Sequence, residues 1–241
     1  MSKTSCARER IPPIACRACD LNTICRLTGL VAYEGGRPRQ PTGALRTLRP
    51  GAALFRAGAP ASALFAIRQG TIKLTRVTAE GDERIVSFHT PGEVLGLEAF
   101  SMGAYVCDAI ALEPVQCCEL PLPLFSDRTA QRAEIAAALV QLLSRAVAIR
   151  PDFARGSARE RVMNFLLDLS QRYAERGLDA SELRLSMSRL EIANLLDTRI
   201  ETVSRTLQQL NREQVIHVRG NRVRLVNAAS ELAMAANERS A

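Results

Sequence analysis

Residues 188–205 read SRLEIANLLDTRIETVSR. Ser188 and Glu191 have the spacing of a capping box, in which a serine oxygen and a glutamate side chain each satisfy a backbone amide at a helix start. Thr198 and Glu201 repeat that spacing, and Asp197 before them is a residue type that tolerates left-handed turn geometry. The stretch therefore predicts two short helices joined by a tight turn, the helix-turn-helix arrangement.

The second helix is predicted over about residues 199–212 and is amphipathic. Its expected buried face consists of Ile200, Val203, Leu207 and Leu210. Its expected exposed face consists of Glu201, Thr202, Ser204, Arg205 and Gln208. Because the second helix of such a motif fits the major groove of B-form DNA, double-stranded DNA is the predicted partner.

Three side chains on that exposed face have the chemistry to read bases. Arg205 can donate two hydrogen bonds to O6 and N7 of guanine, and Glu201 can accept one from the amino group of cytosine. Ser204 can bond to a base or to the DNA backbone. Two alternatives stay open: Glu201 can instead complete the capping box of its own helix, and Arg205 can contact only a phosphate. Thr202 and Arg199 are further candidate contacts.

A hairpin is predicted directly after this helix. Residues 215–218 and 222–226 alternate in polarity on either side of Gly220-Asn221, which is typical of two strands joined by a tight turn. The hairpin would be a wing whose Arg219, Arg222 and Arg224 lie near DNA phosphates. From residue 198 to residue 225 there are six arginines and two glutamates, the excess of positive charge that binding to phosphates requires.

The overall composition agrees with a polyanionic partner and excludes several kinds of enzyme. The net charge of the 241 residues is +7, and all but two of the 32 basic residues are arginine, whose planar fork suits phosphate and guanine. Two histidines, the absence of a Walker loop and the absence of a GxSxG motif argue against an enzyme. No apolar run reaches bilayer length and no export signal is visible, so we expect a cytoplasmic protein.

Upstream, the sequence predicts a β-roll followed by a long helix. Turn glycines recur every eleven or twelve residues between Gly58 and Gly103, which indicates an antiparallel barrel or jelly roll. From residue 129 the apolar period becomes heptad-like, with a seam of Ile135, Leu139, Leu142, Ala146 and Ile149. That seam predicts a helix that packs either on its own barrel or in a two-chain coiled coil.

These features predict an α+β protein divided into four segments. A cysteine-rich segment with a connector covers residues 1–44, and residues 26–50 read as a loop because glycine and proline interrupt them. A jelly-roll β-barrel of the cyclic-nucleotide-binding kind covers residues 45–126, and the dimerisation helix covers residues 127–151. A winged helix-turn-helix, opened by an amphipathic helix over residues 158–176, covers residues 157–241.

Four of the seven cysteines lie in the first 25 residues. Cys16, Cys19 and Cys25 are too close together for sensible disulfides but can surround one centre, and a fourth ligand must come from elsewhere. Cys117 and Cys118 would face opposite sides of a strand, which leaves Cys118 on the outer face of the barrel. Zinc and an iron-sulfur cluster both accept four thiolates, and the spacing alone does not choose between them. By default, Cys6 is expected to be a thiol in a flexible tail and Cys107 a small buried residue.

Together these features resemble the cAMP receptor protein and FNR superfamily of bacterial transcription regulators, and its oxygen-sensing FNR branch most closely. The resemblance covers nearly the whole chain. The matching segments are Cys16-x2-Cys19-x5-Cys25, Leu54–Gly58, Ile67–Lys73, Gly81–Glu83, Cys118–Pro121, Gln171–Gly177 and Glu201–Arg205. The chain departs from the family near the end of the long helix, where Arg150-Pro151 replaces a usual acidic residue.

The resemblance implies that Cys16, Cys19, Cys25 and Cys118 hold an oxygen-labile [4Fe-4S] cluster that favours the homodimer. It also implies that Glu201, Ser204 and Arg205 read TTGAT-type half-sites of a palindrome, and that hairpins such as the one at Gly81 touch RNA polymerase. A regulator that binds a cyclic nucleotide is the main alternative, but no arginine follows Gly92-Glu93 within reach of a phosphate. We therefore expect no cyclic nucleotide; a structural-zinc regulator is the other alternative.

Overall fold

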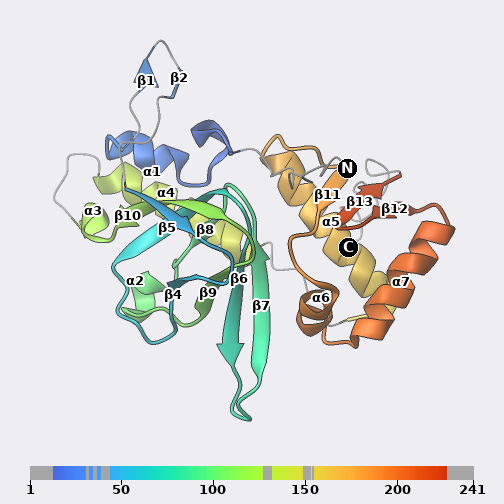
Figure 1. The fold of residues 1–241 in the computed structure, drawn as a ribbon. Coiled ribbons are helices and arrows are strands. Elements are labelled where there is room, and N and C mark those ends of the chain that lie inside the picture. The colour runs from blue at the N-terminus through green and yellow to red at the C-terminus, as the bar shows by residue number, and fades with distance from the viewer. Residues whose placement is uncertain are drawn as a thin grey trace, which may run out of the picture.

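The computed structural model describes residues 13–30, 33–34, 37–38, 44–126, 132–148, 153 and 155–226. Two packed parts are visible, a β-roll with its flanking helices and a smaller helical part with a three-stranded sheet (Figure 1). The mixed α+β class and the jelly-roll architecture predicted from the sequence are confirmed. None of the described helices has the length and apolar character that crossing a bilayer requires.

The roll consists of two four-stranded sheets whose strand pairs are all antiparallel. One sheet has the order β3-β10-β5-β8 and the other β4-β9-β6-β7. The strands are β3 (Leu45–Leu48), β4 (Ala53–Phe55), β5 (Ala63–Gln69), β6 (Ile72–Val77), β7 (Glu83–His89), β8 (Val94–Leu95), β9 (Asp108–Ala111) and β10 (Val115–Pro121). Aromatic side chains fill the space between the sheets, where the rings of Phe55 and Tyr105 stack with centroids 4.0 Å apart.

Gly70 shows why the roll needs glycine at one of its turns. Its φ is +86°, and a Cβ there would lie 2.6 Å from the carbonyl oxygen of Pro114. Only a residue without a side chain fits both this left-handed backbone and this close approach. The turn fixes the connection between β5 and β6.

The N-terminal segment packs on the outside of the roll. It contains a 3-10 turn, η1 (Cys16–Ala18), helix α1 (Asn22–Leu27) and a two-stranded hairpin of β1 (Tyr33–Glu34) and β2 (Arg37–Pro38). Leu21 and Ile24 are buried there in an apolar cluster with Leu64 and Leu120 of the roll. The prediction of a loop over residues 26–50 is therefore wrong in part, since β1, β2 and β3 interrupt it.

Helix α4 (Arg132–Ala148) lies within the predicted range of residues 127–151, whose two ends fall outside the described residues. Two short helices precede it, α2 (Ala99–Met102) and α3 (Pro123–Ser126). Ile135 and Leu142 are buried within the same chain, and α4 packs against α1. Of the two predicted alternatives, packing within its own chain therefore holds for these two residues, and Ile149 lies outside the described residues. The exposed apolar residues of α4 are Val140, Leu143 and Val147.

The helical part is a winged helix-turn-helix. Its elements are α5 (Ala158–Glu175), β11 (Glu182–Arg184), α6 (Arg189–Leu195), α7 (Ile200–Arg212), β12 (Ile216–Arg219) and β13 (Arg222–Leu225). The three strands form one sheet in the order β11-β13-β12. Val203, Leu207 and Leu210 are buried as predicted.

The sequence identified one capping box of the helix-turn-helix and misplaced the other. Ser188 and Glu191 form the predicted box at the start of α6, and Asp197 has the predicted left-handed φ of 49°. Thr198 does not cap α7: the N-cap is Arg199, with no side-chain bond to the helix. The helix therefore begins later than predicted, and Ile200 in its first turn is 37% exposed rather than buried.

One face of α5 binds the roll through buried charges. Nη1 of Arg172 lies 3.0 Å from Oε1 of Glu93, and its Nε lies 2.9 Å from Oδ2 of Asp168. Burial alone would raise the pKa of Glu93, but the Arg172 guanidinium and the His89 ring hold that pKa well below its ordinary value. One helical turn later, Nη2 of Arg176 lies 2.8 Å from Oδ2 of Asp20, beside Cys19. A single helix thus contacts both the roll and the cysteine segment.

A second contact joins the β6–β7 hairpin to the helix-turn-helix. Oδ1 of Asn194 accepts a hydrogen bond from the amide of Ile85 at 2.7 Å, and its Nδ2 donates to the carbonyl of Glu83 at 2.9 Å. Nη2 of Arg84 lies 2.8 Å from Oδ1 of Asp197 in the turn before α7. The roll therefore contacts the turn that positions the second helix of the motif.

We expect Arg172→Met to lower the free energy of unfolding by about 3–5 kcal/mol, because Glu93 and Asp168 would stay buried without their cation. Urea unfolding at pH 7 measures this loss. The double variant Glu93→Gln, Arg172→Met should recover much of it, since one of the unpaired charges is removed. A single variant as stable as the wild type would contradict this reading.

The same pair gives a signed pH dependence. The folded-state pKa of Glu93 is depressed, so its stabilising contribution is present above the ordinary value of 4.5 and disappears as the pH falls below it. The difference in unfolding free energy between wild type and the Arg172→Met variant should therefore shrink on acidification from pH 7 to pH 4.

Candidate metal centre and nucleic-acid interface

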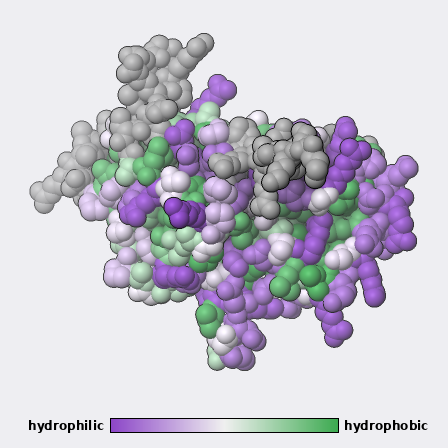
Figure 2. Space-filling view, in the orientation of Figure 1, coloured by the Kyte–Doolittle hydropathy of each residue, from purple (hydrophilic) through white to green (hydrophobic). Residues whose placement is uncertain are grey.

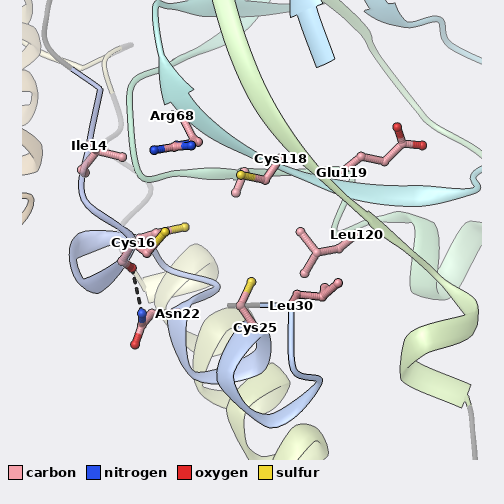
Figure 3. Close-up of a pocket in the computed structure, with 11 residues that line it drawn as sticks. Ile14, Cys16, Asn22, Cys25, Leu30, Arg68, Cys118, Glu119 and Leu120 are labelled. Carbon is pink, nitrogen blue, oxygen red and sulfur yellow. Dashed lines mark hydrogen bonds between the residues drawn. The ribbon is translucent and has the colours of Figure 1, made fainter. Parts of the chain in front are cut away.

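Four thiols from two distant segments line one cavity. Cys16 begins η1, Cys19 follows it, Cys25 lies in α1, and Cys118 lies on β10. The cavity is lined by these four residues and by mostly apolar neighbours, including Ile14, Leu30, Ala66 and Leu120. Figure 3 shows Cys16, Cys25 and Cys118 around a common space. The sequence predicted that these four residues surround one centre, and in the structure all four line the same cavity.

Strand alternation decides which of the two neighbouring cysteines faces the cavity. Cys117 is fully buried in the core between the sheets with Val115. Cys118 points to the other face of β10, opposite Ala66 of β5 and Leu45 of β3. The predicted orientation of this pair is confirmed. Cys107 is buried, as expected, and Cys6 lies outside the described residues.

Backbone hydrogen bonds attach the cysteine segment to the roll. The amide of Ile14 donates to the carbonyl of Arg68 at 2.8 Å, and the amide of Asp20 donates to that of Gly92 at 3.0 Å. Within the segment, Nδ2 of Asn22 donates to the carbonyl of Cys16 at 2.9 Å. These bonds fix the turn that carries Cys16 and Cys19 against β5.

Burial disfavours the ionised form of Cys19, Cys25 and Cys118, because it raises the pKa of each thiol. The pKa of Cys19 and of Cys25 rises to about 12, mainly through burial and to a lesser extent through the neighbouring cysteines. Burial also raises the pKa of Cys118 to about 11, against the opposing effect of the Arg68 charge. Because a thiolate is the form that binds a metal, these four sulfurs would ionise together with the arrival of a positively charged centre.

The donor set, four cysteines around one cavity, has the chemistry of both a zinc site and an iron-sulfur cluster. Among the described residues, no group of three histidine, cysteine or acidic side chains lies close enough to hold one metal ion. Tetrahedral zinc, at about 2.3 Å from each sulfur, needs the sulfurs about 3.8 Å apart. A four-iron core binds each thiolate at a separate iron, so its ligands stand further apart. Four thiols around one apolar cavity fit that larger centre.

The second site is the exposed face of α7. Glu201, Ser204 and Arg205 line a shallow, open depression together with Ile200 and Gln208. Glu201 and Arg205 are exposed, whereas Ser204 is half-buried. Hydrophilic side chains gather along the edge of the molecule where α7 lies (Figure 2). The predicted base-reading residues thus share one accessible surface.

The position at which α7 begins decides between the two predicted roles of Glu201, capping its own helix or contacting a base. Since Arg199 is the N-cap and forms no side-chain bond to the helix, the predicted capping box of Thr198 and Glu201 does not form. The Glu201 carboxylate is therefore not used in capping its own helix and stays accessible to a ligand that binds the exposed face of α7. The flanking candidates differ in exposure: Arg199 is exposed and Thr202 is half-buried.

The predicted wing is present, with Gly220 at its tip in a left-handed conformation (φ 61°). Arg219 and Arg224 are exposed. Arg222 forms an ion pair at 3.1 Å with Glu182 of β11, and both side chains remain more than 40% exposed. Such a surface pair contributes little free energy, so a phosphate can replace Glu182 as the partner of Arg222.

Sequence reasoning missed two arginines that act on these sites. Nη1 of Arg161, on α5, donates to the carbonyls of Leu196 and Asp197 at 3.0 and 3.3 Å and so holds the turn before α7. Arg68, on β5, lines the cysteine cavity. Their partners lie far away in the sequence, so no local motif reveals them.

Family models match the roll and the helix-turn-helix part of the chain. The family model of the cyclic nucleotide-binding domain matches residues 45–132, and that of the Crp-like helix-turn-helix domain matches residues 160–230. The chain is 32% identical to the transcriptional activator protein anr of Pseudomonas aeruginosa, over 95% of each chain. It is 30% identical to the fumarate and nitrate reduction regulatory protein of Salmonella typhimurium, over 94% of this chain and 92% of the relative.

The structure is also similar to that of FixK2 from Bradyrhizobium japonicum. The TM-score is 0.70 at 24% identity, and the match covers 78% of this chain and 95% of that one. At this level of identity the likeness supports the fold.

We expect Arg205→Ala to lose about 1–3 kcal/mol of binding to a specific DNA site, the value of a bidentate contact to guanine. Titration of labelled palindromic and scrambled duplexes at one salt concentration measures the loss. Arg212→Ala, at the other end of α7, is the matched control and should weaken both duplexes slightly and alike. An equal loss on both duplexes for Arg205→Ala would mean that Arg205 contacts only phosphates.

Proposed function

The chain belongs to the CRP/FNR family of transcription regulators, and on that basis we propose that it senses oxygen through a cysteine-bound [4Fe-4S] cluster. It is a DNA-binding regulator of the FNR type. The observation that carries the proposal is the shared cavity of Cys16, Cys19, Cys25 and Cys118. When bound, the cluster supplies a centre that molecular oxygen can oxidise.

The chain has a short route from the cysteines to the proposed dimer seam. Cys25 lies on α1, which packs directly against α4. The opposite side of α4 exposes Val140, Leu143 and Val147, which recur with the spacing of a coiled-coil seam. Fixing α1 through Cys25 would fix α4 and present these residues to a second copy. We propose this face as the homodimer interface.

A dimer would place two copies of α7 on one duplex. Glu201, Ser204 and Arg205 would then read the two TTGAT-type halves of a palindrome, and Arg219 and Arg222 would contact phosphates beside them. Arg199 and Thr202 are proposed flanking contacts. The hairpin at Gly81 is a proposed contact with RNA polymerase. We propose the functional division already given: residues 1–44, 45–126, 127–151 and 157–241.

A regulator controlled by a cyclic nucleotide is the second candidate, because the matching family model carries that description. Against it, Glu93 in the turn after β7 is already paired with Arg172 of α5 and lies 3.1 Å from Nδ1 of His89. We favour the cluster, since the cavity with four thiols explains the cysteine-rich segment and a nucleotide does not. A four-thiolate centre also suits the reducing cytoplasm, where we expect the protein to act.

Cys118→Ala should abolish the visible absorbance of anaerobically reconstituted protein, because the cavity loses its ligand from the roll. Cys117→Ala, its neighbour in the sequence, should leave the absorbance and the iron content unchanged, because that side chain faces the core between the sheets. Alanine is chosen for both so that no unpaired hydroxyl is buried at position 117. Retention of the cluster by the Cys118 variant would refute the proposed ligand set.

Val147→Glu should raise the dissociation constant of the dimer by about 100-fold or more, since a carboxylate buried without a partner costs about 3–5 kcal/mol. Sedimentation of anaerobic, cluster-loaded protein measures the change. Gln141→Glu, exposed elsewhere on α4, is the control and should dimerise like the wild type. If both variants stayed dimeric, the interface would lie elsewhere.

A further inference from the structure

Arg68 occupies a special position in the cysteine cavity. It lies on β5 two residues after Ala66, and Ala66 pairs with Cys118 across the sheet. Alternation along the strand puts Arg68, Ala66 and Cys118 on the same outer face. Among the described residues that line the cavity, Arg68 is the only cation. Figure 3 shows its guanidinium at the rim, between Ile14 and Cys118.

Within the described part of the chain, the Arg68 guanidinium carries a donor without an acceptor, and its charge acts on Cys118. Its Nε is buried without a hydrogen bond among the described residues. The one carboxylate that lines the cavity is that of Glu119, and Arg46 already binds it with two hydrogen bonds of 2.6 and 3.2 Å. A buried donor left unpaired costs about 1–3 kcal/mol. An acceptor for this buried donor would therefore stabilise the site.

The missing acceptor follows from the charge of the site. Four thiolates carry four negative charges, and either a [4Fe-4S] core or a zinc ion returns only two positive ones. The loaded centre is a dianion among apolar side chains, where an uncompensated charge is costly. One guanidinium beside Cys118 halves that net charge and offers N–H donors to sulfur.

We propose that Arg68 is the charge-compensating partner of the thiolate centre, holding its guanidinium against the sulfur of Cys118 and the neighbouring cluster. The inference rests on the proposed cluster and concerns how the roll stabilises it. Arg68 would act as a positioning residue and is not a ligand. Through Arg68, strand β5 of the roll would influence the charge and the reduction potential of the centre.

Two properties of the loaded protein depend on this contact. Loss of a residue that supports metal ligands lowers metal affinity by about 10- to 100-fold, so iron would be released more readily. Hydrogen bonds to the sulfurs and net charge set the reduction potential of a cluster. Removing a positive charge makes loss of an electron easier, so the cluster would also decay faster in air.

The test compares Arg68→Met with Arg68→Lys and Arg17→Met in the full-length chain. Methionine fills similar space without charge, and lysine keeps the charge without the planar fork. Arg17→Met makes the same chemical change beside Cys16, but Arg17 is exposed and does not line the cavity. Each protein is reconstituted anaerobically with ferrous iron and sulfide and then challenged with a ferrous chelator; a second aliquot is exposed to air while its absorbance is followed.

We expect Arg68→Met to retain iron about 10- to 100-fold less well than the wild type and to bleach faster in air. Arg68→Lys should fall between the two proteins, and Arg17→Met should match the wild type because solvent and salt screen its charge. Equal iron retention and equal bleaching in Arg68→Met and wild type would overturn the inference. So would equal losses in Arg68→Met and Arg17→Met, since they would mean a diffuse effect of net charge.

Two controls separate this inference from folding and from the proposed function. The hydrogen bond between Ile14 and Arg68 uses main-chain atoms, so it survives the substitution. The metal-free Arg68→Met protein should melt no lower than the metal-free wild type, because an unpaired buried donor has been removed; a lower melting temperature would assign Arg68 a purely structural role. A wild-type chain that binds no iron would refute the proposed function itself. If the wild type binds the cluster and Arg68→Met retains it equally well, only this inference is refuted.

Discussion

The position of four thiols around one apolar cavity is the constraint on which the rest of the structure depends. Burial raises the pKa of Cys19 and Cys25 to about 12, so neither sulfur ionises alone near neutral pH. A cationic centre reverses this balance for all of the sulfurs together, because each thiolate then faces positive charge. Loss of the centre returns mutually repelling thiolates to an apolar site. Burial therefore favours two conditions for Cys19, Cys25 and Cys118, either protonated or bound to a cationic centre.

The remaining architecture connects that cavity to the DNA-reading surface. Helix α1 carries Cys25 and packs on α4, whose outer face is apolar. In the same chain, Asp20 beside Cys19 is paired with Arg176 at the end of α5. Arg161 on α5 in turn holds the turn before α7. The cysteine segment is thus connected through packed helices to both the proposed dimer interface and the helix-turn-helix. A change in that segment can reach either one without passing through a long loop.

Local patterns in the sequence predicted the elements well, and long-range pairs were beyond them. Alternation on a strand correctly separated Cys117 from Cys118, and the spacing of Ser188 and Glu191 correctly located a helix start. The same spacing gave a wrong N-cap at Thr198. The geometry of the preceding turn decides which residue becomes the N-cap, and a capping motif in the sequence does not show that geometry. The heptad spacing correctly predicted a helix at α4. The spacing alone does not say which side of that helix packs on the roll. Pairs such as Glu93 with Arg172 join residues 79 apart in the chain and leave no local signal.

The most direct test measures metal content and DNA binding on one preparation. Protein purified without oxygen is analysed for iron, sulfide and zinc, and its affinity for a palindromic TTGAT-type duplex is measured before and after exposure to air. We expect a coloured protein containing iron and sulfide that loses its colour, its dimer and its specific binding together in air. A colourless, zinc-loaded protein that binds the duplex equally well with and without air would contradict it.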